Sequence, residues 1–204
     1  MHPRLRIVLV GLVACAVTAL AAVSIADSRR DDAPPPARAV AFAGGLRPKG
    51  VPPADFALRD EQGATVRLAD LRGRPVILTF MYSTCRDTCP LTADQIRGAL
   101  DDLGGAAPPA FAMSVDPAND TPENASAFLL KHKLTGRMRF LLGSRAQLAP
   151  LWKAYGVQPQ GKAFDHSAYV LLIDREGRGR IGFPLNQLTP EALAHDVRLL
   201  AAGA

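Results

Sequence analysis

The sequence predicts an α/β domain in which a central sheet is covered by helices on both faces. Short apolar runs rich in β-branched and aromatic residues alternate along the chain with segments whose apolar residues recur at helical spacing. Of the 204 residues, 48% are hydrophobic and 21% are charged, a balance that provides enough apolar material for a packed core. A chain of this length holds one domain with additional segments, or at most two small domains.

The domain is predicted to open with a β-hairpin. Its first strand contains Phe56–Leu58, a turn follows at Asp60–Gly63, and Thr65–Leu68 alternates polar and apolar residues. A buried strand is expected at Val76–Tyr82, because this run is continuous, apolar and rich in residues that favour strands.

Helices and strands then alternate to the end of the chain. Apolar residues at helical spacing predict a helix from Pro90 to about Leu103. Further strands are predicted at Ala110–Val115, Arg139–Leu142, Ala168–Ile173 and Arg180–Phe183. Further helices are predicted to follow the capping residues Thr121, Ser144 and Thr189. The second of these should end at Gly156, and Pro150 inside it predicts a kink or a later start.

The N-terminal segment, residues 1–27, is interpreted as a signal anchor or a cleaved signal peptide. Ile7–Ala26 is apolar and uncharged, and its length favours an anchor. Arg4 and Arg6 before it favour a cytoplasmic N-terminus. A lipoprotein-type cleavage site at Cys15 is a third interpretation, and all three place the rest of the chain outside the cytoplasm. Residues 28–53 are interpreted as a Pro-rich spacer and residues 54–204 as the domain.

The basic excess does not indicate a nucleic-acid binder. The formal net charge is +5, but residues 1–30 alone hold four Arg and one Asp. The remainder of the chain is nearly balanced and contains no long basic run, so we expect no nucleic-acid partner.

Two of the three cysteines, Cys85 and Cys89, mark the candidate site. They lie in the segment TFMYSTCRDTCPLT, directly after the buried strand and at the expected start of a helix. Four residues of helix separate two Cα atoms by roughly 6 Å, which suits either a disulfide or a shared metal ion. A helix N-terminus and Arg86 favour the thiolate, whereas Asp87 opposes it.

Three chemistries remain open for this pair: a structural disulfide, a redox-active dithiol and a metal site. A disulfide closing so short a loop would stabilise the fold little. A metal site needs further ligands, and of His2, His132, His166 and His195 only His166 directly precedes a predicted buried strand. Two thiolates and an imidazole suit Cu(I) and can hold Cu(II), although zinc accepts the same ligands.

Several motifs together resemble the Sco/SenC family of copper chaperones. They are Leu68–Gly73, TFMYSTCRDTCPLT, Ser114–Pro117, Asp120–Glu123, and Asp165–Ser167 before the strand that ends in Leu172–Asp174. The resemblance implies a thioredoxin-like fold and copper ligands at Cys85, Cys89 and His166. One residue departs from the family pattern, because Arg86 stands where members typically carry Pro.

The same resemblance implies a partner and a location. Family members deliver copper to the binuclear copper site of cytochrome c oxidase subunit II, and some are proposed to reduce the cysteines of that site, which would require a thiol reductant. The domain would be anchored to the bacterial inner membrane and would face the periplasm, or it would be exported.

An alternative function is that of an extracytoplasmic thiol-disulfide oxidoreductase using Cys85 and Cys89. This protein would be an enzyme, whereas a metallochaperone is not one in the strict sense. It would need both cysteines but not His166. Asp116 and Asp120 are assigned turn and capping roles.

Overall fold

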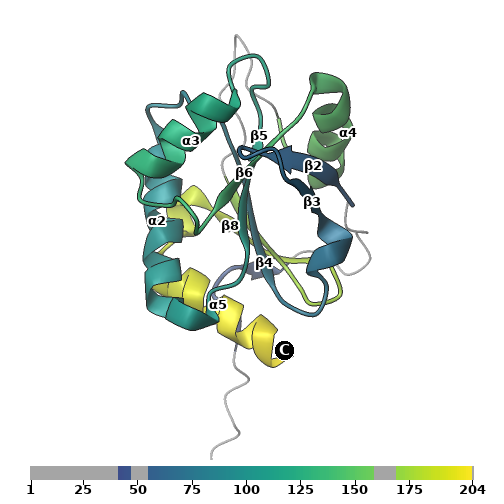
Figure 1. The fold of residues 1–204 in the computed structure, drawn as a ribbon. Helices are drawn as coiled ribbons and strands as arrows, with labels where there is room; N and C mark the ends of the chain where they lie inside the picture. Colours follow the sequence, from purple (N-terminus) through teal and green to yellow (C-terminus); the bar gives the residue numbers. More distant parts are fainter. Residues whose placement is uncertain (1–40, 47–54, 159–168, 204) are drawn as a thin grey trace, which may run out of the picture. The chain divides into compact units, whose positions relative to one another are not determined.

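The structure, a computed structural model, describes residues 41–46, 55–158 and 169–203. The described residues from Phe42 onward belong to one compact unit. The prediction of a mixed α/β domain with a central sheet is confirmed in these residues (Figure 1). Among them, no helix is long and apolar enough to cross a membrane.

Within the described ranges, eight strands form one sheet in the order β1-β8-β7-β4-β5-β6-β2-β3. Their bounds are β1 Gly45–Leu46, β2 Ala57–Asp60, β3 Thr65–Arg67, β4 Val76–Met81, β5 Ala110–Ser114, β6 Arg139–Leu142, β7 Tyr169–Ile173 and β8 Gly179–Pro184. The strands β4, β5 and β6 are parallel, and the remaining pairs are antiparallel. All six residues of β4 are buried, as expected for a central strand covered on both faces.

Helices cover both faces of the sheet, as predicted. Their bounds are α2 Thr88–Leu103, α3 Pro122–Lys131, α4 Arg145–Tyr155 and α5 Pro190–Ala202. The apolar sides of α2, α3 and α5 pack into one hydrophobic core, while α4 packs into a second core on the other face. Figure 1 shows α2, α3 and α5 on one side of the sheet and α4 on the other.

The predicted caps determine where three helices start. The hydroxyl oxygens of Thr121, Ser144 and Thr189 each accept a hydrogen bond from a backbone N–H in the first helical turn. Ser144 also completes a capping box, so α4 begins immediately after it and continues through Pro150. A later start of this helix, one of the two outcomes expected from Pro150, is therefore wrong. The helix α2 begins two residues before Pro90.

The edge strand β1 was not predicted, and it lies inside the stretch interpreted as a spacer. Gly45 and Leu46 pair with β8. Just before this strand, the backbone N–H groups of Ala43 and Gly44 donate to the carboxylate of Asp196 in α5, at 2.8 and 2.9 Å. A short run without periodicity gives no strand signal, whereas the partners that hold it lie far along the sequence.

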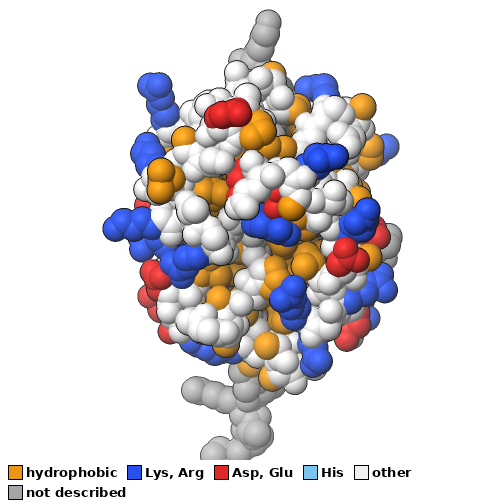
Figure 2. All heavy atoms as spheres, viewed as in Figure 1, with side chains coloured by type: hydrophobic (Ala, Val, Ile, Leu, Met, Phe, Trp, Pro, Cys, Tyr) orange, Lys and Arg blue, Asp and Glu red, His pale blue; other side chains and the backbone are white. Residues whose placement is uncertain are grey.

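Charged side chains of both signs are distributed over the surface. Figure 2 shows Lys and Arg spread around the visible face, with acidic and apolar side chains between them. Several form exposed ion pairs, such as Arg198 with Asp102 at 3.1 Å. Pairs of this kind contribute little to stability individually.

Candidate metal and redox site

The dithiol is built at the junction between a strand and a helix. The strand β4 ends at Met81, Cys85 lies in the following turn, and Cys89 lies in the first turn of α2. The backbone N–H of Cys85 donates to the carbonyl oxygen of Tyr82 at 3.2 Å, which closes the turn. This places the pair beyond the carboxyl end of a parallel strand, where sites in α/β sheets form.

The sulfur of Cys85 occupies the position of a helix cap. The first N–H groups of a helix have no partner within the helix, and Asp87 makes no side-chain capping hydrogen bond to them. The backbone N–H of Cys89 instead donates to Cys85 Sγ at 3.4 Å. The positive end of the helix dipole is therefore directed at this sulfur, an arrangement that favours negative charge.

The two thiols differ in acidity. Burial of Cys85 opposes its ionisation, but hydrogen bonds from the Cys89 thiol, from the backbone N–H groups of Asp87 and Cys89 and from the Tyr82 side chain outweigh burial and lower its pKa. Burial raises the pKa of Cys89 far above its usual range, and the adjacent Cys85 raises it further. Cys85 is 8% exposed and Cys89 is only 1% exposed. Cys85 is therefore both the more acidic and the more accessible of the two residues.

The structure brings Cys85 and Cys89 together without a disulfide between them. The third predicted ligand, His166, lies outside the described residues, as does His2. Among the residues that are described, no group of three His, Cys, Asp or Glu side chains could hold a metal ion. His132 packs instead against Phe128, with Nδ1 3.4 Å from Asp94.

One described strand leads away from the segment that contains His166. The strand β7 begins at Tyr169 and runs antiparallel to β4, with Val170 opposite Thr79. The hydroxyl of Thr79 donates to the carbonyl oxygen of Tyr169 at 3.1 Å. The first residue of β7 therefore lies at the end of the sheet where β4 leads to the dithiol.

The turn and capping roles expected for Asp116 and Asp120 do not account for Asp120. Thr121 caps α3, whereas Asp120 is buried and accepts hydrogen bonds from Ser83 and Ser114. Burial raises the pKa of Asp120 although these hydrogen bonds oppose the change. Asp116 does form the predicted turn, because its carbonyl oxygen accepts from the N–H of Asn119 at 3.0 Å. In the sequence, the only indication that Asp120 matters was its place in the Asp120–Glu123 motif, close to that turn.

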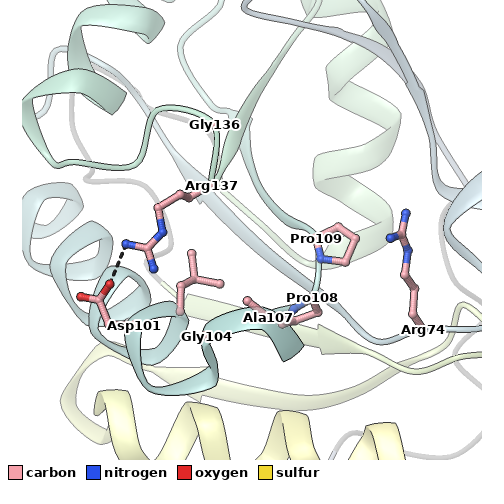
Figure 3. Close-up of a pocket in the computed structure, with 9 residues that line it drawn as sticks. Arg74, Asp101, Gly104, Ala107, Pro108, Pro109, Gly136 and Arg137 are labelled. Carbon is pink, nitrogen blue, oxygen red and sulfur yellow. Dashed lines mark ion pairs between the residues drawn. The ribbon is translucent and has the colours of Figure 1, made fainter.

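A cavity of about 580 Å³ lies at the opposite end of the parallel strands (Figure 3). Arg74, Pro109 and Arg137 line it, each one or two residues before a strand begins. Figure 3 shows Arg137 paired with Asp101, and Arg74 beyond the two prolines. The distance between the paired nitrogen and oxygen atoms is 2.7 Å. Since the dithiol follows the carboxyl end of β4, this cavity is separate from the candidate site.

These features define a class of protein: an α/β domain of the thioredoxin-like kind with a dithiol between a central strand and a capped helix. The sequence profile described as SCO1/SenC matches residues 47–202. The chain therefore belongs to the SCO1/SenC family, and the predicted family is confirmed.

Individual relatives agree with this assignment. Protein SenC of Rhodobacter capsulatus is 34% identical over 154 residues, which cover 70% of this chain and 67% of that protein. The mitochondrial SCO2 homolog of Bos taurus is 30% identical over 145 residues, covering 65% of this chain and 53% of that protein. The matched region thus spans about half the length of that mitochondrial relative.

Solved structures show the same fold. The copper-bound ScoI of Bradyrhizobium japonicum superposes with a TM-score of 0.59 at 30% identity and covers 72% of this chain and 98% of that one. The apo form of Sco1 from Thermus thermophilus gives a TM-score of 0.64 at 28% identity, covering 78% and 97% respectively. The thioredoxin-like fold implied by the sequence motifs is confirmed.

Proposed function

We propose that this chain is a copper chaperone that binds copper as cargo through Cys85, Cys89 and His166 and passes it to cytochrome c oxidase during assembly. The observation that carries the proposal is the position of Cys85 Sγ, which caps α2 beside the thiol of Cys89. Family membership and the copper-bound relative from Bradyrhizobium japonicum support the choice of metal.

The chemistry of the donors suits Cu(I). Thiolate sulfur is a soft ligand, and Cu(I) prefers soft ligands at low coordination number. The lowered pKa of Cys85 makes its thiolate easier to form, while Cys89 would have to lose its proton when copper binds. Copper loading should therefore release protons and strengthen as the pH rises.

His166 completes the proposed ligand set. It precedes Tyr169 by three residues, and three residues of extended chain span at most about 10 Å. Because Tyr169 lies at the dithiol end of the sheet, this length supports an imidazole ligand from the same side.

In the same proposal, residues 1–27 tether the domain to the bacterial inner membrane, and most of residues 28–53 forms the spacer. The client is the binuclear copper site of cytochrome c oxidase subunit II, and a thiol reductant keeps the dithiol reduced. Arg86 is exposed beside Cys85, so it would contact the client rather than the metal.

The unequal thiols favour a second candidate function, reduction of a client disulfide. The thiolate of Cys85 would attack one sulfur of the client disulfide and release the other as a thiolate, forming a mixed disulfide. Cys89 would then lose its proton and attack Cys85 Sγ, which releases the second client thiolate. The client gains two electrons, and the Cys85–Cys89 pair becomes a disulfide.

The test is a count of bound Cu(I) on the reduced full-length chain against a chromophoric competitor. A Cys15→Ser background leaves Cys85 and Cys89 as the only thiols. One copper per chain is expected, with binding lost in Cys85→Ala and Cys89→Ala and weakened in His166→Ala, while His195→Ala serves as the control. Equal binding by the His166→Ala variant would refute the three-ligand set. No binding by any form would leave the reductase function as the better proposal.

A further inference from the structure

The carboxylate of Asp120 joins two segments that the sequence places far apart. It is 7% exposed and lies just before α3. Its Oδ1 accepts from the backbone N–H of Ser83 at 2.7 Å and from the Ser83 hydroxyl at 2.6 Å. Its Oδ2 accepts from the hydroxyl of Ser114 at 2.5 Å. Both oxygens therefore have partners, and these partners lie on different elements.

Those partners flank the route from the sheet to the dithiol. Ser114 is the last residue of β5 and lies beside Met81, the last residue of β4. Ser83 lies in the turn after β4, two residues before Cys85. The carboxylate thus fastens this turn to the neighbouring strand.

No local role accounts for a buried carboxylate at this position. Thr121 caps α3, and Asp116 supplies the turn after β5. A hydroxyl or an apolar side chain at position 120 could not accept all three hydrogen bonds, whereas a carboxylate offers about four acceptor sites on two oxygens. Burying a charge is costly unless the charge is hydrogen-bonded, and the three hydrogen bonds offset that cost here. Two of the three come from Ser83, so the carboxylate acts mainly on the turn after β4.

Ser83 lies within the turn that leads from β4 to Cys85. Tyr82 precedes Ser83, and its carbonyl oxygen accepts the N–H of Cys85 at 3.2 Å. Cys85 Sγ then meets the N–H of Cys89 at the start of α2. We propose that Asp120 is a positioning residue for the dithiol: through Ser83 it holds the Cys85 sulfur at the α2 N-terminus and thereby tunes both thiol reactivity and copper affinity. The copper part rests on the proposed function, whereas the thiol part does not.

The test compares three variants of the reduced full-length chain in the Cys15→Ser background. Asp120→Ala removes all three hydrogen bonds. Asp120→Asn removes the charge but can keep all three, because its amide oxygen accepts from Ser83 and its NH₂ donates to the Ser114 hydroxyl. Asp116→Ala is the matched control, since the Asp116 carboxylate accepts from the side chain of Asn119 in the turn after β5, away from Ser83.

Two quantities are measured: the pH profile of Cys85 alkylation by iodoacetamide, resolved by peptide mass spectrometry, and the Cu(I) dissociation constant. Thermal unfolding identifies variants that do not fold. For Asp120→Ala we expect the alkylation profile to move to higher pH and Cu(I) affinity to fall about tenfold. Asp120→Asn and Asp116→Ala should stay close to the parent chain. If Asp120→Ala does not fold, Ser83→Ala, which removes only one hydrogen bond, should shift both quantities in the same direction.

The outcomes separate this proposal from the function on which it partly rests. If Asp120→Ala unfolds at a lower temperature but keeps the parent alkylation profile and copper affinity, the role is merely structural and the proposal fails. If Asp120→Asn behaves like Asp120→Ala, charge rather than hydrogen bonding acts on the site, and positioning is refuted. If the parent chain binds no Cu(I) while Asp120→Ala still shifts the alkylation profile, the copper function fails and the positioning role stands.

Discussion

Replacing Asp196 with Ala should destabilise the domain by removing the acceptor that holds the chain segment before β1. Asp196 is 0% exposed, and its carboxylate receives the N–H groups of Ala43 and Gly44 at 2.8 and 2.9 Å. Hydrogen bonds to charged groups contribute about 1.5–3 kcal/mol each. The bond from Gly44 is buried and the bond from Ala43 is partly exposed, so the expected loss is about 3 kcal/mol.

The assay is reversible unfolding of the full-length chain by urea and by heat, followed by circular dichroism. A loss of about 3 kcal/mol corresponds to a fall in Tm of about 6–12 °C for a domain of this size. Asp102→Ala is the matched control, because Asp102 is 49% exposed and its ion pair with Arg198 lies on the surface. Its expected cost is below about 1 kcal/mol. Equal losses of unfolding free energy in Asp196→Ala and Asp102→Ala would refute the reasoning, since a buried carboxylate that accepts backbone hydrogen bonds would then contribute no more than an exposed one.

Three further predictions concern packing, thiol chemistry and acid stability. Gly44→Ala should lower the Tm, because a Cβ there would lie 2.5 Å from a side-chain atom of β8. The same change at Gly182, where a Cβ would have no atom within 4 Å, should lower it less. Equal melting temperatures of the two variants would contradict this expectation. In the reduced chain, iodoacetamide should modify Cys85 before Cys89 at neutral pH, because the pKa of Cys85 is lowered and that of Cys89 is raised; the reverse order by mass spectrometry would show that the assignment is wrong. The pKa of Asp174 is lowered, because hydrogen bonds from Arg178 outweigh the effect of burial. The Asp174 carboxylate should therefore stabilise the fold fully above about pH 4 and lose that effect as the pH falls through its folded-state pKa. Asp174→Asn should be less stable than the parent chain at pH 7 and approach it in acid. A difference in stability that does not depend on pH would refute this link between the pKa and stability.

The sequence determined those parts of the fold that depend on neighbouring residues. The buried strand β4 follows from its continuous apolar run, and α3, α4 and α5 begin at the predicted capping residues because a cap acts within one helical turn. The dithiol is likewise determined by local sequence. Cys85 and Cys89 lie between a strand and a helix that are both encoded locally, so their proximity followed from spacing alone.

Only the tertiary structure decided which polar groups are buried and which partners they find. Asp120 bonds to Ser83, 37 residues away, and Asp196 bonds to Ala43, 153 residues away. Such pairings leave no period or spacing in the sequence, because they arise when separate elements pack against each other. The unequal acidity of Cys85 and Cys89 has the same origin, since burial and hydrogen bonding in the folded domain, rather than the two identical side chains, set their pKa values.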